Sequence, residues 1–207
     1  MKRAARLAIL AILLELAVAH SFAAGAGGLL FGLAEPSWNP SFMPSIPDSF
    51  KGLEYFGGYG YGVDSSDRIS GGFGLAFLDY ESMDAANRGS AGSVPGYFVG
   101  GAGGLIVGSR LIGGRALHLD LAARLGLGGV GVSTRTGSAG TWSYSDTGYA
   151  IAYAEPYAEL GLGLSPWMQV SATLGYPFIG NLAPGKPFAD FVYWAPTFGV
   201  TVTFGSF

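Results

Sequence analysis

Seven polar side chains, spaced two or four residues apart on two neighbouring stretches of the sequence, have the residue types for ionic and acid–base chemistry. They are His118, Asp120, Arg124, Tyr153, Glu155, Tyr157 and Glu159. If the stretches pair as antiparallel strands with residue numbers that sum to about 279, Arg124 lies opposite Glu155 and Asp120 opposite Glu159. Because opposite side chains on one face of a sheet are about 5 Å apart, this register predicts an Arg124–Glu155 ion pair. Adjacent carboxylates repel each other, so His118 or a shared proton is expected beside Asp120 and Glu159.

The periodicity of the two stretches supports this pairing. In 117–128, five leucines at positions 117, 119, 121, 125 and 127 share one face, and the ionisable residues share the other. Successive side chains of a strand point to opposite faces, whereas no helix brings five residues with this spacing onto one face. The stretch 149–164 alternates alanine and leucine with tyrosine and glutamate. Both stretches are therefore predicted to be strands with one apolar and one polar face.

Six further segments of extended character accompany these two strands. In chain order, the eight segments cover residues 28–34, 53–63, 69–80, 97–108, 117–128, 149–164, 168–176 and 190–204. Their connections alternate between long and short. The long ones are a polar stretch at 81–93 and the segments 35–50, 133–146 and 177–187, which are expected to be loops. A short turn is expected at 110–115. This alternation is typical of bacterial outer-membrane barrels, which have long outer loops and short periplasmic turns.

The composition agrees with strands that cross a membrane. Apolar residues make up 49% of the chain, yet beyond the N-terminal segment no run of about 18 apolar residues could form a transmembrane helix. Alternating strands satisfy both facts when apolar faces contact lipid and polar faces line a closed lumen. The predicted fold class is therefore all-β, an antiparallel up-and-down transmembrane β-barrel of about eight strands. Side chains nearly fill the lumen of such a barrel. The glycines expected to face inward and leave some space are Gly72, Gly74, Gly100, Gly104, Gly126 and Gly128.

The N-terminal segment has the features of a secretory signal peptide, with a basic start followed by an apolar stretch at 7–19. Small residues at Ala17 and Ala19 predict cleavage after Ala19, and cleavage after Ala24 is the alternative. The expected domains are a signal peptide at 1–19 and a barrel at 20–207. The expected location is the bacterial outer membrane, as an integral protein whose main partner is the lipid bilayer.

The last predicted strand carries a second recognisable pattern. It resembles the C-terminal assembly signal of bacterial outer-membrane barrels, with Thr197, Gly199, Val202 and Phe204 at the matching positions and Phe207 as the alternative final aromatic. The whole predicted barrel is similar in architecture to the transmembrane domains of OmpA-, OmpX- and OmpW-like proteins. That resemblance implies insertion by the outer-membrane barrel assembly machinery through the C-terminal strand. It also implies a structural or adhesive role through the outer loops.

Composition and motifs argue against other functions. The formal net charge of −3 gives no electrostatic reason to bind nucleic acid, and the absence of cysteine excludes disulfides and thiol chemistry. The GxGxxG pattern at 126–131 precedes a Ser/Thr/Gly stretch rather than a helix, so no phosphate site is expected. Neither metal-ligand spacing nor a cofactor motif is found, and the expected outer loops lack histidine, so no enzymatic activity is predicted. The alternatives are a narrow channel or small-ligand transporter, and a secreted lipocalin-like binding barrel.

Overall fold

The computed structural model describes residues 25–34, 53–78, 97–114, 116–136, 143–182, 192–194 and 196–205. Every regular element in these ranges is a β-strand. The strands are β1 (Gly25–Ala34), β2 (Leu53–Val63), β3 (Arg68–Leu78), β4 (Tyr97–Ile112), β5 (Leu117–Thr136), β6 (Ser143–Ser165), β7 (Met168–Gly175), β8 (Phe178–Asn181), β9 (Val192–Trp194) and β10 (Thr197–Gly205). The described part of the chain contains no helix long and apolar enough to cross a bilayer. The predicted signal peptide lies outside the described residues.

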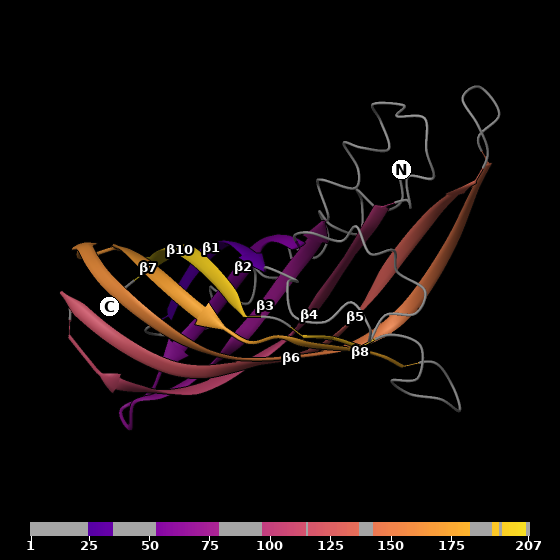
Figure 1. The fold of residues 1–207 in the computed structure, drawn as a ribbon. Helices are drawn as coiled ribbons and strands as arrows, with labels where there is room; N and C mark the ends of the chain where they lie inside the picture. Colours follow the sequence, from indigo (N-terminus) through magenta and orange to yellow (C-terminus); the bar gives the residue numbers. More distant parts are fainter. Residues whose placement is uncertain are drawn as a thin grey trace.

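The strands close into a barrel by antiparallel pairing of neighbours (Figure 1). Strands β1 to β6 pair in chain order, β6 pairs with β7, and β10 pairs with both β7 and β1. Near the opposite end, β8 takes the place of β7 beside β6, and β9 pairs with β8. With β7/β8 and β9/β10 each occupying one position, the ring contains eight strands, which confirms the predicted fold class.

Strand boundaries differ from the sequence prediction in several places. The strand predicted at 190–204 is divided into β9 and β10. The predicted loop at 133–146 is wrong in part, because β5 continues to Thr136 and β6 begins at Ser143, with Thr136 paired to Ser143. These two strands extend beyond the other strands at the right of Figure 1. The predicted loop at 177–187 contains β8, and the predicted turn at 110–115 is shorter because β4 runs to Ile112.

A proline accounts for the break between β7 and β8. Pro177 has no N–H to donate to a neighbouring strand, so regular pairing stops at this position. Pairing of β6 passes from Tyr157↔Gly175 with β7 to Ala154↔Phe178 with β8. The Tyr176 N–H still donates to the carbonyl of Pro156 at 3.0 Å, which holds the wall together across the break.

The exterior of the barrel is apolar, as the leucine periodicity predicts. Leu125 is 47% exposed and Leu127 is 66% exposed, whereas Arg124, which directly precedes Leu125 and points to the other face, is 1% exposed. The same alternation holds on β1, β4, β6, β7 and β10, whose exposed large apolar residues include Leu29, Phe31, Leu105, Leu160, Leu174, Phe198 and Val200. A lipocalin-like soluble barrel would turn these side chains inward, so the exterior contradicts that alternative. An apolar exterior around a polar interior defines a membrane-spanning barrel.

Strand β3 faces the other way from the prediction for its glycines. Phe73, Leu75 and Phe77 are buried in the lumen, so the alternating Gly72 and Gly74 lie on the outer face, and the expectation that they face inward is wrong. An eight-stranded barrel has a narrow interior that side chains must fill, and bulky residues fill it better than glycines do. The other predicted inward glycines, on β4 and β5, share the parity of the buried Ala102, Ile106 and Val130.

The turn between β2 and β3 is fixed by one side chain. Asp64 Oδ1 accepts hydrogen bonds from the backbone N–H groups of Ser66, at 2.8 Å, and Arg68, at 3.0 Å. These bonds stabilise the carboxylate and lower the pKa of Asp64 below its usual value. Asp67 adopts a left-handed conformation with φ 58°, which aspartate tolerates in a tight turn.

Candidate functional site: the lumenal polar cluster

The structure places all seven polar residues singled out on β5 and β6 inside the barrel. The exposed fractions are 0% for His118, 3% for Asp120, 1% for Arg124, 4% for Tyr153, 1% for Glu155, 8% for Tyr157 and 3% for Glu159. Arg124 pairs with Glu155 and Asp120 with Glu159, the register expected from the sequence. The seven residues form two groups. The Glu155 group consists of Glu155, Arg124, Tyr153 and Tyr157. The His118 group consists of His118, Asp120 and Glu159.

In the Glu155 group, one carboxylate accepts three hydrogen bonds. Arg124 Nη1 donates to Glu155 Oε2 at 2.6 Å, and the Tyr153 hydroxyl donates to the same oxygen at 2.7 Å. Thr197 Oγ1 on β10 donates to Glu155 Oε1 at 2.9 Å. The guanidinium carbon of Arg124 also lies 4.0 Å from the ring centroid of Tyr157, a cation–π contact. These three hydrogen bonds and the contact with the Tyr157 ring compensate for burying the charges of Arg124 and Glu155 away from water.

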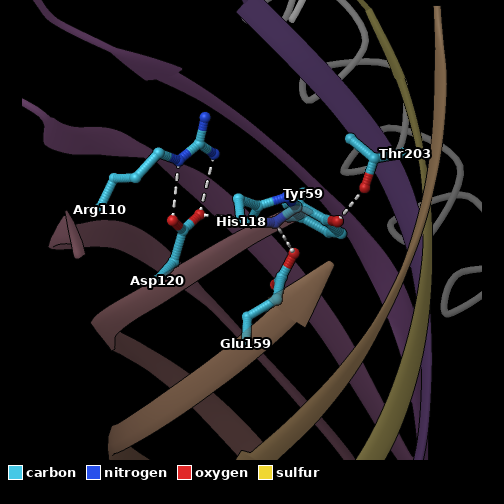
Figure 2. Close-up of polar contacts among 6 residues, drawn as sticks. All are labelled: Tyr59, Arg110, His118, Asp120, Glu159 and Thr203. Atoms are coloured by element: carbon cyan, nitrogen blue, oxygen red, sulfur yellow. Dashed lines mark hydrogen bonds and ion pairs between the residues drawn. The ribbon is translucent and has the colours of Figure 1, made fainter. Parts of the chain in front are cut away.

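The His118 group lies close to the short turn between β4 and β5, because Arg110 is near the end of β4 and His118 near the start of β5. Figure 2 shows its polar contacts. Arg110 on β4 binds Asp120 in a bidentate pair, with Nε–Oδ1 at 2.8 Å and Nη2–Oδ2 at 3.0 Å. His118 Nε2 lies 3.7 Å from Asp120 Oδ2 and 3.6 Å from Glu159 Oε1. The imidazole therefore lies between the carboxylates of Asp120 and Glu159, and Asp120 is already paired with Arg110.

Sequence reasoning missed Arg110 and the side-chain role of Thr197. Arg110 falls within the predicted turn at 110–115, but it has the parity of the inward residues of β4, so extending that strand by one pair would have placed it in the lumen. Thr197 was assigned only to the assembly signal. No sequence feature indicates that it reaches Glu155, because β7 lies between β10 and β6.

Aromatic side chains fill the lumen around these groups. The Tyr153 ring lies 5.6 Å from the Phe73 ring and 5.7 Å from the Phe77 ring, measured between centroids. Strands β3 and β6 are three positions apart in the ring, so these contacts cross the lumen. On the other side, Tyr59 stacks on Tyr61 with centroids 5.8 Å apart. The Tyr59 hydroxyl also makes a short hydrogen bond with Thr203 on β10, across the intervening β1.

The four residues of the predicted assembly signal all lie on β10. Thr197 and Gly199 are buried on the inner face, while Phe204 is 45% exposed on the outer face. The Phe204 ring stacks on Trp167 in the β6–β7 turn, with centroids 6.1 Å apart. β10 is the strand that closes the ring through nine residue pairs with β1. Recognition of this strand by the assembly machinery stays a prediction.

Gly161 makes room for the imidazole of His118. It is the residue opposite His118 on β6, and a methyl group built at Gly161 would overlap the ring atoms Cε1, Nε2 and Nδ1. His118 can therefore lie between the two carboxylates because the residue opposite it, Gly161, has no side chain.

Replacing Gly161 with alanine is expected to destabilise the folded barrel by about 1–3 kcal/mol, because the imidazole must move within a packed interior. Urea unfolding of the purified protein in lipid vesicles measures the change. Gly148→Ala on the same strand is the matched control, since a methyl group there has no neighbour within 4 Å. Equal stability of the two variants would show that the position of the His118 ring is not restrained by Gly161.

Across the described ranges, no group of three or more His, Cys, Asp or Glu side chains is arranged to hold a metal ion. The contacts that the structure shows within the cluster are ion pairs, hydrogen bonds and a cation–π contact.

Comparison with known proteins gives similarity in structure only. No family model matches the chain, and no curated protein matches it in sequence. Neisserial surface protein A is 14% identical with a TM-score of 0.47, covering 87% of this chain and 94% of that one. The N-terminal β-barrel domain of OprF from Pseudomonas aeruginosa is 12% identical with a TM-score of 0.44, covering 87% and 97%. Ail, the attachment invasion locus protein of Yersinia pestis, is 14% identical with a TM-score of 0.44, covering 88% and 96%.

Proposed function

We propose that this protein is an integral outer-membrane β-barrel with a structural and surface-interaction role, and that its lumen is closed to solutes. The apolar exterior supports a place in a bilayer, and the short turns at one end with long connections at the other support the outer membrane. The part of the chain that the structure describes offers no arrangement that favours catalysis over this role.

The observation that carries the closed lumen is the position of Tyr153. Its ring contacts Phe73 and Phe77 from the opposite wall, while its hydroxyl is bonded to Glu155. The aromatic contacts across the lumen and the buried Arg124–Glu155 ion pair between β5 and β6 support an interior filled by side chains, as expected for eight strands. This packing favours the structural role over a channel.

The paired extension of β5 and β6 supports contact at the cell surface. The part of β5 after Ser133 and the part of β6 before Ala150 pair with each other and not with β4 or β8. This ribbon projects past the other strands on the side of the long connections (Figure 1). A strand pair held on a rigid barrel is a suitable support for a binding loop.

Liposome swelling with small sugars and amino acids tests the closed lumen. Liposomes containing the folded protein are expected to swell no faster than liposomes without it, whereas an open barrel gives rapid swelling. Folding in the same samples is checked by electrophoresis in SDS, because a folded barrel changes mobility when boiled. Swelling by a sample that shows this shift would support the narrow-channel alternative, and absence of the shift in membrane-extracted protein would contradict the barrel in a bilayer.

A further inference from the structure

The ionisable side chains in the described lumen do not balance in charge unless one proton is added. They comprise the carboxylates of Asp120, Glu155 and Glu159, the guanidinium groups of Arg110 and Arg124, and the imidazole of His118. Arg124 is paired with Glu155, and Arg110 is paired with Asp120. Glu159 is the carboxylate left without an arginine. Its Oε1 is buried and has no hydrogen-bond partner among the described residues.

His118 stands beside this carboxylate and is itself unsatisfied. The side chain is fully buried, and neither ring nitrogen has a hydrogen-bond partner in the described structure. Nε2 is 3.6 Å from Glu159 Oε1, which is one small displacement from hydrogen-bonding distance. Buried polar atoms are nearly always paired, so an imidazole and a carboxylate that face each other with free positions point to a shared proton.

The groups around His118 on every adjoining strand are consistent with this view. Asp120 lies on its own strand, Arg110 on β4 and Glu159 on β6. Tyr59 and Tyr61 on β2 and Tyr157 on β6 interact electrostatically with Glu159. On β7, Thr173 is paired with Glu159 and Ser171 with Gly161, and these buried residues carry no charge, as is also true of Gln169 and of Thr203 on β10. No second cation reaches Glu159 from these strands.

We propose that His118 and Glu159 form a proton-binding site, which holds one proton in the folded barrel. The proton lies on the imidazole as an ion pair with Glu159, or on the carboxyl as a hydrogen bond to the neutral ring, and both arrangements neutralise the set. Without it, one carboxylate charge would stand unpaired in an interior that water does not reach, which is strongly unfavourable. The proposal rests on the lumenal geometry and is independent of any role at the cell surface.

The site links the stability of the barrel to pH. In the unfolded chain, a histidine has lost its proton above a pH of about 6.5 and a glutamate above about 4.3. Above pH about 6.5, folding must therefore take up one proton, so stability falls as the pH rises. For one proton, the folding equilibrium constant falls about tenfold for each pH unit, until the folded site releases its proton.

Urea unfolding in lipid vesicles across pH about 6.5–9 tests this linkage. The wild type is expected to lose about tenfold in folding constant per pH unit over the first part of this range. Glu159→Gln is expected to remove most of that slope, because the remaining charges balance without a proton. Glu54→Gln is the matched control, since Glu54 is exposed on β2 and its loss should leave the slope of the wild type unchanged.

Proton uptake on refolding provides a second measurement that needs no variant. Wild-type protein refolded at pH about 7.5 in weak buffer is expected to take up about one proton per chain, detected with a pH indicator. A slope in Glu159→Gln equal to that of the wild type would overturn the proposal, and so would refolding without proton uptake. If Glu159→Gln fails to fold, the uptake measurement alone decides.

Discussion

Replacing Arg124 with methionine is expected to destabilise the barrel by about 3–5 kcal/mol, the cost of leaving one partner of a buried ion pair alone. Glu155 would keep hydrogen bonds from Tyr153 and Thr197 but lose its counter-charge, and both Arg124 and Glu155 are only 1% exposed. Methionine retains much of the length of the arginine stem over the Tyr157 ring, so the loss is mainly electrostatic.

The measurement is urea unfolding in lipid vesicles, with a second substitution to separate charge from packing. Adding Glu155→Gln to Arg124→Met removes the unpaired carboxylate and is expected to recover part of the lost stability. Arg68→Met, at the exposed first residue of β3, should leave stability nearly unchanged. If the double variant is as unstable as the sum of the two single variants, the residues do not interact as an ion pair.

Replacing Leu125 with arginine is expected to cost about 2–4 kcal/mol of stability in a bilayer, the cost of a charge on the lipid face near the midplane. Leu125 is 47% exposed on the outer face and pairs with Leu105 near the centre of β4. In a water-soluble protein, replacing a half-exposed leucine with arginine would change stability little. The size of the loss therefore shows whether lipid or water surrounds the outer face of the barrel.

Leu117→Arg is the matched control for this prediction. Leu117 has the same parity and is 42% exposed, but it is the first residue of β5, where a cost of about 0–1 kcal/mol is expected near the interface. Unfolding in vesicles compares the two variants with the wild type. Equal effects at the two positions would contradict a depth-dependent apolar environment around the barrel.

The sequence predicted β5 and β6 well because ionisable residues mark one of their faces. Charge cannot face lipid, so Arg124 and Glu155 determine which way each strand is turned, and the leucines then follow. Their register was recoverable because placing Arg124 opposite Glu155 forms an ion pair on the polar face of both strands. Alternation of connection lengths gave the strand number.

Strand β3 could not be oriented in this way because neither of its faces carries a charge between Ile69 and Leu78. Aromatic and aliphatic residues alternate with glycine, serine and alanine, and both lipid and a narrow lumen accept either set. Which set faces inward depends on the volume that the other strands leave in the lumen. That volume is fixed by contacts such as Phe77 with Tyr153, which are distant in sequence and have no local signal.

Similarly, composition could not separate the end of a strand from a loop at 133–146. Serine and threonine are common in loops, and threonine is also a good strand residue. What extends β5 to Thr136 is pairing with Ser143 on β6, a property of two strands together and of neither alone. The break at Pro177 was part of a predicted loop because a single proline does not reveal that pairing resumes at Phe178.

The pairing of β1 with β10 has a consequence for biogenesis. One edge of β1 pairs with β2, and the other edge pairs only with residues 197–205 of β10. That second edge of β1 therefore stays unpaired until nearly the whole polypeptide has been made. Contacts of such large sequence separation form slowly, because a long loop must close before they contribute. During that interval the leucine-rich faces are exposed to water and can contact other unfolded chains. The chain must therefore be kept from aggregating until β1 pairs with β10.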